Sequence, residues 1–275
     1  MNKIRFTANE TTNYVFHMLS VAKCGYDNAY GEAYRSLYPA ENLAVLKEHE
    51  DLLTICGGTH CGALYPMLVR GAARAEQPAE VYYAGLLRGT PADLEGYADA
   101  IRQISGVMLR HCGSYLTDIW PAEREKIAAY IPEVRRLFED TDFTEKAEAA
   151  IGVRLPREAF TATLVTSVEN GPEAIDISDE QDVFGIERTP LDAFYFIGHE
   201  FIIYLLFEAL KETSAFQTQA TWNITEGLAE FYIKQVMGGL RFSYHQKYVE
   251  FFEACCASAR PIPAELYEKG CTAFC

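Results

Sequence analysis

Basic residues are scarce in this chain of 275 residues, where 24 lysines and arginines stand against 39 aspartates and glutamates. The formal net charge is −15 at pH 7, and no run of lysine or arginine interrupts the acidic composition. Nucleic acids and anionic membrane surfaces repel such a chain, so the sequence argues against both as partners.

An uninterrupted apolar segment of about 18 residues, which a transmembrane helix needs, is also lacking. The longest candidate, residues 191–210, contains four ionisable side chains: Asp192, His199, Glu200 and Glu208. Residues 1–6 do not have the apolar core of a signal peptide. We therefore expect a cytoplasmic protein, with no membrane partner, whose eight cysteines are mostly reduced thiols.

What the chain does contain is a high share of core-forming residues, with 49% hydrophobic and 13% aromatic side chains. This composition excludes disorder. Residues 1–154 show apolar side chains at helical spacing between Pro and Gly turns, with helix starts near Ala40, Thr90 and Pro121 and a kink or break at Pro132. We assign this region to helices of unknown role.

Beyond residue 155 the pattern changes to that of a small sheet followed by two helices. Residues 159–168 and 173–178 have the alternation and β-branched content of strands, and Asn170-Gly171 between them favours a turn. The predicted fold class is α+β and mostly α. We expect the helical part, 1–154, and the mixed part, 155–275, to pack as one compact unit.

The first of the two helices is predicted over residues 190–210. Thr189 is a hydroxyl N-cap, Pro190 fits the first helical position and Asp192 complements the helix dipole. The helix is apolar on nearly every side, so His199 and Glu200 in its middle need partners. Gly198 would let another backbone approach closely. A buried His-Glu pair indicates a site.

The second helix is predicted over residues 223–237, ending at Gly238-Gly239. Glu226 and Glu230 are four residues apart and share a face. One interpretation of Glu226 is structural, because with Asn223 as N-cap it would complete a capping box. The other interpretation is that it belongs to the same site as His199.

The segments His199-Glu200 and Thr225-Glu226-Gly227-Leu228-Ala229 resemble the gluzincin metallopeptidases, in which a His-Glu-x-x-His helix is followed by a helix carrying a glutamate ligand. The order of strands, motif helix and glutamate helix is similar too, over about the last 120 residues. The resemblance implies a zincin-like core with His199 and Glu226 as zinc ligands and Glu200 as general base.

The chain departs from this pattern at Ile203, which occupies the position of the second histidine. Zinc sites of this kind use three protein ligands and a water. Glu230, His245 or a residue of the N-terminal half could substitute, or Glu200 could become a ligand and lose its role as base. We expect zinc to be absent and the protein to be inactive as a peptidase.

Two further groups of residues are candidates for chemistry. His245, or its neighbours Tyr244 and Tyr248, could stabilise the oxyanion of an active gluzincin, although packing roles are more common for such residues. Residues 56–61, Cys-Gly-Gly-Thr-His-Cys, resemble half of a metal site, with His111-Cys112 as another half. We interpret these cysteines as buried thiols, because no second cysteine pair follows at the required spacing.

Three functional hypotheses follow from these patterns. The leading one is a metallopeptidase-like protein with an altered or lost zinc site, which binds a peptide or protein segment in the former cleft. The second is an active zinc hydrolase with a non-standard third ligand. The third is a non-enzymatic helical protein in which His199, Glu200 and Glu226 form a buried hydrogen-bonded network.

Overall fold

The computed structural model describes residues 2–56, 60–75, 77–169, 174–178, 180–257 and 261–275, with the backbone alone at Ile55, Cys56 and His60. Its contacts divide the chain into two compact units. Unit 1 comprises residues 1–5, 132–162 and 188–275, and unit 2 comprises residues 6–131 and 163–187. This division runs differently from the predicted boundary at 154/155.

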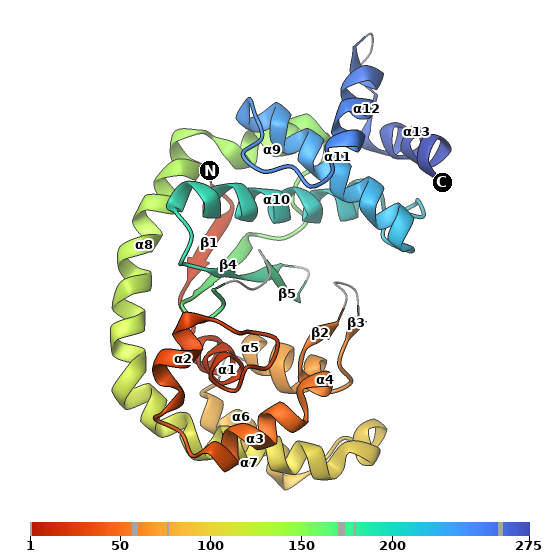
Figure 1. Cartoon of the computed structure of the whole chain (residues 1–275). Coiled ribbons are helices and arrows are strands. Elements are labelled where there is room, and N and C mark those ends of the chain that lie inside the picture. The colour runs from red at the N-terminus through yellow and green to blue at the C-terminus, as the bar shows by residue number, and fades with distance from the viewer. Residues whose placement is uncertain (1, 57–59, 76, 170–173, 179, 258–260) are drawn as a thin grey trace. The chain divides into compact units, whose positions relative to one another are not determined.

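Helices dominate, and the fold is α+β and mostly α as predicted (Figure 1). The α-helices are α1 Glu10–Val21, α2 Ala29–Arg35, α3 Ala40–Glu48, α4 Glu50–Leu53, α5 Ala72–Arg74, α6 Ala79–Arg88, α7 Ala98–Ser114, α8 Trp120–Asp140, α9 Phe143–Ile151, α10 Pro190–Ala209, α11 Gln219–Met237, α12 Gln246–Cys256 and α13 Pro263–Phe274. Short 3₁₀ or π segments cover Tyr65–Gly71, Ala92–Tyr97 and Tyr115–Ile119. Helix α8 continues through Pro132, so of the predicted kink or break at this residue the break is wrong.

The sheet has four strands in the order β1-β4-β6-β5, with β1 Ile4–Thr7, β4 Phe160–Val165, β5 Ile175–Ser178 and β6 Gln181–Gly185. Both predicted strands form, β4 within 159–168 and β5 within 173–178, but they are not neighbours in the sheet, because β6 lies between them and pairs antiparallel with β5. Residues 170–173, with the predicted turn, lie outside the described residues. A second, two-stranded sheet pairs β2 Ile55–Cys56 with β3 His60–Cys61.

Helix α1 forms the core of unit 2. Every residue from Thr11 to Val21 is buried, and α2, α5, α6 and α7 all contact this helix. Two of its buried hydroxyls are satisfied by backbone carbonyls: the Thr11 hydroxyl donates to Gln77 and that of Thr12 to Ala73, both at 3.0 Å. Hydrogen bonds of this kind remove the penalty for burying polar groups.

Helix α11 has the corresponding role in unit 1, where it contacts α9, α10, α12 and α13 (Figure 1). Two glycines permit this packing. A Cβ on Gly227 would lie 2.3 Å from Tyr248 Cβ on α12, and one on Gly198 of α10 would lie 2.9 Å from side-chain atoms of Phe143 and Met237. Gly198 therefore accommodates side chains rather than the approaching backbone that we predicted.

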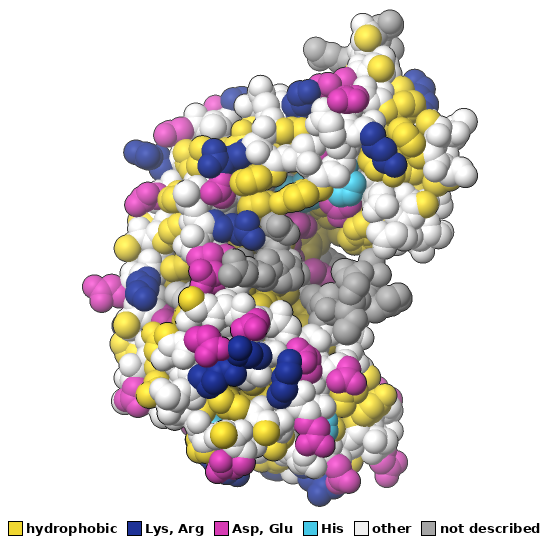
Figure 2. Space-filling model, in the orientation of Figure 1, with side chains coloured by type: hydrophobic (Ala, Val, Ile, Leu, Met, Phe, Trp, Pro, Cys, Tyr) yellow, Lys and Arg dark blue, Asp and Glu magenta, His cyan; other side chains and the backbone are white. Residues whose placement is uncertain are grey.

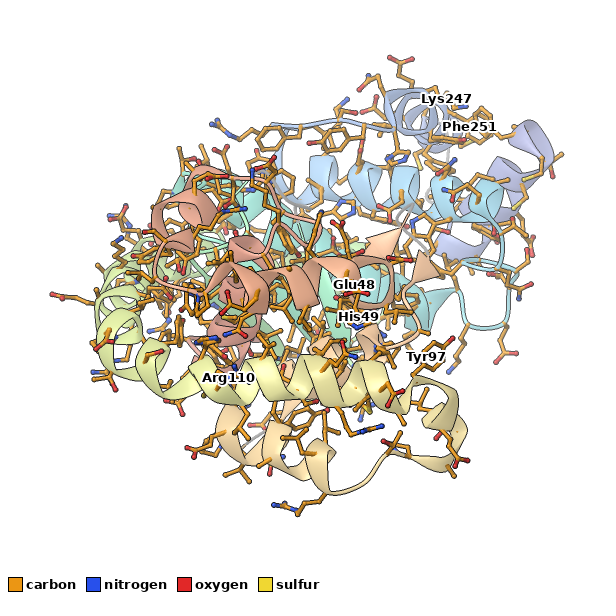
Figure 3. All side chains as sticks on the ribbon, turned by 60° about the horizontal axis from the view of Figure 1, so that its bottom comes forward. Glu48, His49, Tyr97, Arg110, Lys247 and Phe251 are labelled. Atoms are coloured by element: carbon orange, nitrogen blue, oxygen red, sulfur yellow. The ribbon has the colours of Figure 1, made fainter. Side chains whose placement is uncertain are left out.

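Helices α12 and α13 pair through aromatic contacts. Phe251, labelled in Figure 3 with Lys247 one turn before it, has its ring centroid 5.1 Å from that of Phe274 on α13. The Lys247 ammonium lies 5.5 Å from the ring centroid of Phe274 on α13. Such cation–π contacts add to the apolar packing that fixes the last helix.

Helix α10 begins as its sequence predicts. The Thr189 side chain accepts a hydrogen bond from the Asp192 backbone N–H, and Pro190 occupies the first helical position. By length and composition α10 could cross a membrane, but 61% of its apolar window is buried inside the protein. Core helices of globular proteins have the same composition.

Candidate functional site

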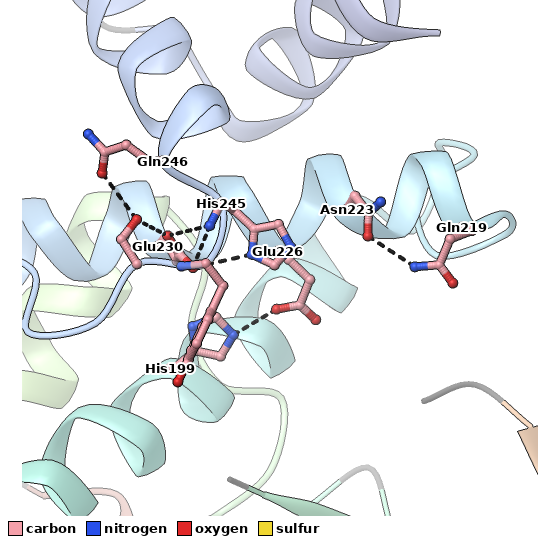
Figure 4. A network of polar contacts seen from close by, with 9 residues as sticks. His199, Gln219, Asn223, Glu226, Glu230, His245 and Gln246 are labelled. Carbon is pink, nitrogen blue, oxygen red and sulfur yellow. Dashed lines mark hydrogen bonds and ion pairs between the residues drawn. The ribbon is translucent and has the colours of Figure 1, made fainter. Parts of the chain in front are cut away.

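The candidate site lies where α10 and α11 pack against each other in unit 1. His199 projects from the middle of α10 and Glu226 from the second turn of α11, with side chains 21% and 16% exposed. The histidine Nε2 lies 2.9 Å from the glutamate Oε2, and Figure 4 shows the two side chains directed at each other. The structure thus brings together two of the residues that the motif singled out.

Glu226 does not cap its helix, so the predicted capping box with Asn223 is wrong. Helix α11 begins at Gln219, and the capping box is formed by Thr218 and Thr221. Each of these two threonine side chains binds the other residue's backbone N–H, at 3.2 and 2.9 Å. Glu226 therefore lies well inside the helix, and its carboxylate is available for the contact with His199.

The charge of Glu226 changes the protonation of His199. Burial alone would lower the pKa of this imidazole. The hydrogen bond and the charge of Glu226, helped by the charges of Glu200 and Glu230, outweigh that effect and raise the pKa of His199 to about 9. At neutral pH the contact is therefore an ion pair in which the imidazolium Nε2–H donates to the carboxylate.

Glu230, one turn after Glu226, binds the segment that precedes α12 (Figure 4). Its carboxylate accepts hydrogen bonds from Ser243 Oγ at 2.8 Å, from the backbone N–H of Tyr244 at 2.8 Å and from the backbone N–H of His245 at 3.1 Å. Burial would raise the pKa of Glu230, but these bonds and the His245 side chain outweigh it and lower the pKa.

His245 belongs to the same arrangement. It is the N-cap residue of α12, and its Nδ1 lies 3.2 Å from Glu230 Oε1. Tyr244 is exposed, and Tyr248 packs against Gly227. In the structure Glu230 and His245 thus contact each other. The sequence pattern predicts Glu230 as a metal ligand and His245 as an oxyanion stabiliser.

These residues do not fit a three-ligand zinc centre. The 2.9 Å between His199 Nε2 and Glu226 Oε2 is the distance of a direct hydrogen bond, and the pair supplies only two of the three protein ligands that such a centre needs. Ile203, one turn after His199, has no donor atom, and the Glu230 carboxylate is already used by Ser243, Tyr244 and His245. Among the described residues no cluster of three His, Cys, Asp or Glu side chains has metal-binding geometry.

Glu200, the predicted general base, is half-buried on α10 beside His199. Its negative charge is one of those that raise the pKa of that histidine. The structure therefore places Glu200 close enough to act on the electrostatics of the site.

An aromatic surface lies one turn from Glu226 along α11 and two turns from His199 along α10, and sequence patterns did not single it out. We define it by Phe207 of α10, Phe216 of the connecting segment and Trp222 of α11. The Phe216 ring centroid lies 4.2 Å from that of Phe207 and 5.3 Å from that of Trp222. All three side chains are partly exposed, and Phe207 is 38% exposed. Figure 2 shows histidine, acidic and hydrophobic side chains side by side over α10 and α11.

Of the cysteine-rich segment 56–61, the structure describes the side chain of Cys61 alone. Cys61 is exposed, so the prediction of a buried thiol is wrong there. Cys112 is buried. The side chain of Cys56 lies outside the described residues. The imidazole of His111 contacts Asn42, with 2.8 Å between Nε2 and Nδ2. The seven cysteines whose side chains the structure describes form no disulfide bonds with one another.

Unit 2 contains a second buried polar network, centred on His17. Its Nε2 lies 2.7 Å from the Tyr38 hydroxyl, and its Nδ1 contacts the Tyr30 hydroxyl. Tyr30 and Tyr115 both donate to the carboxylate of Glu123. If the Tyr38 hydroxyl donates to Nε2 and Nδ1–H donates to the Tyr30 oxygen, every donor and acceptor of His17 in this network has a hydrogen-bond partner. Burial lowers the pKa of His17 to about 3, so the imidazole is neutral.

No protein-family model, curated protein or solved structure matches this chain.

Proposed function

We propose that this chain is a metallopeptidase-like protein that has given up its zinc site, and that the face around His199 and Glu226 binds a peptide or a segment of another protein without cleaving it. The observation that carries this proposal is the direct His199–Glu226 contact of 2.9 Å with Ile203 on the next turn. The imidazole proton lies between the histidine nitrogen and the glutamate oxygen, where a divalent cation would have to bind.

The donor set supports this proposal over an active hydrolase. Losing one of three ligands weakens a zinc site strongly, because affinity depends on ligand number and geometry. The substitute ligands suggested by the sequence, Glu230 and His245, are committed to the start of α12. Moving Glu230 into a metal site would leave the backbone N–H groups of Tyr244 and His245 without this acceptor, and moving the His245 imidazole would break its contact with Glu230.

A purely structural role is the competing candidate, and the same ion pair favours it. A satisfied His-Glu pair between two packed helices stabilises their register whatever the surface binds. What favours binding is the partly exposed aromatic surface beside the pair, because exposed rings gathered at one place mark interaction sites more often than structural ones.

Zinc titration of the purified protein tests the proposal. We expect the wild type to take up less than one equivalent of zinc by calorimetry and elemental analysis. We expect Ile203→His to bind zinc roughly tenfold or more tightly, because it restores the third ligand. Ile203→Gln is the matched control, since it introduces a polar side chain that is a poor zinc ligand. Stoichiometric zinc in the wild type, lost in His199→Ala, would contradict the proposal.

A further inference from the structure

Phe216 has a backbone conformation that aromatic residues rarely adopt. Its φ of 65° lies in the left-handed region, where glycine is the usual residue. The Phe216 ring is only partly buried, and it packs between the rings of Phe207 and Trp222. Strain of this kind gathers at functional sites. The Phe216 ring therefore contributes more to the aromatic surface than to the hydrophobic core.

The aromatic surface continues the row of residues that carries the ion pair. His199, Ile203 and Phe207 occupy successive turns of α10, and Trp222 lies one turn before Glu226 on α11. Four residues of helix rise about 6 Å, which is the distance between residues two apart in an extended peptide. An extended segment could thus place one side chain at Glu226 and the next one of the same face on Trp222.

The charged side chains on this face determine whether an acidic or a basic segment binds there. His199 is one positive group among three carboxylates, those of Glu226, Glu200 and Glu230, all of which act on its protonation. The chain as a whole carries a charge of −15. An acidic segment would be repelled and a basic one attracted, and exposed aromatic faces also favour a cation.

We infer that this face binds a peptide segment in which a basic group, an ammonium or a guanidinium, stands two residues from an apolar side chain. The basic group lies against the Glu226 side of the ion pair, and the apolar side chain lies on the aromatic surface. The inference rests on the proposed function and names the ligand class for the same site.

Calorimetry with short peptides tests this inference on the full chain. The reference probe is acetyl-Gly-Lys-Gly-Phe-Gly-amide. Two further probes replace its Lys by Glu or its Phe by Ser, and a fourth, Gly-Gly-Phe-Gly-amide with a free amino end, supplies the ammonium from the N-terminus. We expect the reference probe to bind roughly tenfold or more tightly than the Glu and Ser probes. The fourth probe tells a side-chain cation from a terminal one.

Two variants assign the effect to the named residues. Glu226→Gln should remove most of the preference for Lys over Glu, whereas Glu265→Gln on α13, an exposed acid on another helix, should leave it unchanged. Phe216→Gly should weaken binding of the reference probe about tenfold without lowering the melting temperature, because glycine relieves the left-handed strain.

The outcomes separate this inference from the proposed function. Equal affinity for the Lys and Glu probes, or no binding of any probe, overturns the inference. If zinc is absent and acidic or neutral peptides bind best, the inference fails while the proposed function stands. Stoichiometric zinc with cleavage of the probes overturns the proposed function itself.

Discussion

His199 on α10 and Glu226 on α11 form an ion pair with 2.9 Å between Nε2 and Oε2, at the point where the two helices pack. Because the pair joins two packed helices, a change in its charge also affects the packing of unit 1. Its protonation therefore has consequences for stability as well as for ligand binding.

The stability of the protein should fall as the pH rises from about 6.5 to about 9. His199 has a raised pKa of about 9 in the folded protein against 6.5 when exposed, so its contribution is complete below 6.5 and is lost through 9. At about 1.36 kcal/mol for each pH unit, the contribution is on the order of 3 kcal/mol. Urea unfolding at pH 6, 7.5 and 9 measures it, with His199→Gln as a variant that lacks this titration.

Glu226→Gln should lower the pKa of His199 itself, because the amide keeps a hydrogen-bond acceptor but removes the charge that offsets burial. NMR titration of the imidazole signals measures this value directly. We expect it to move from about 9 toward or below the ordinary 6.5. An unchanged pKa would show that Glu226 is not the group that holds the proton on His199.

Glu230→Gln should loosen the start of α12. The carboxylate accepts from two backbone N–H groups, those of Tyr244 and His245, and an amide provides a single, uncharged acceptor oxygen. We expect a loss of about 1–3 kcal/mol in the free energy of unfolding, and faster hydrogen exchange at these two amides. Ser243→Ala removes one hydrogen bond to the same carboxylate and should cost about 0.5–1.5 kcal/mol.

Local signals predicted the parts of the fold that depend on a few neighbouring residues. Thr189, Pro190 and Asp192 begin α10 as expected, and Gly238 ends α11 with a φ of 76°. The start of α11 was misplaced because Asn223 and Thr218 are both good caps by sequence. The reciprocal bonds between Thr218 and Thr221 show that the helix begins before Asn223.

Long-range pairing could not be predicted in the same way. Strand β1 contains four residues, too few for a periodic signal, and β6 separates β4 from β5 although β5 comes between them in sequence. At the site, the motif grouped His199 with Glu226 from the order of the helices. The partners of Glu230 escaped prediction because two of them are backbone N–H groups, which carry no sequence signal.

His17 should make unit 2 sensitive to acid. Its pKa is lowered by burial to about 3 in the folded protein, so between pH 6.5 and 3 the unfolded chain binds a proton that the folded chain does not. Stability should therefore fall as the pH decreases, by roughly 2 kcal/mol between pH 7 and pH 5 from this residue alone. Urea unfolding at both values measures the fall. His17→Gln should reduce it by that amount, whereas the titration of other groups remains in both proteins.

Gly227→Ala should destabilise unit 1 although alanine favours helices. The new Cβ would lie 2.3 Å from Tyr248 Cβ, a contact that forces α12 away from α11, and overpacking of this kind costs about 1–3 kcal/mol. Gly106→Ala is the matched control, because Gly106 lies inside α7 with no atom within 4 Å of the added Cβ. That variant should gain about 0.5–1 kcal/mol. Urea unfolding of both variants separates helix propensity from the packing of α11 against α12, and equal effects would contradict the close approach at Gly227.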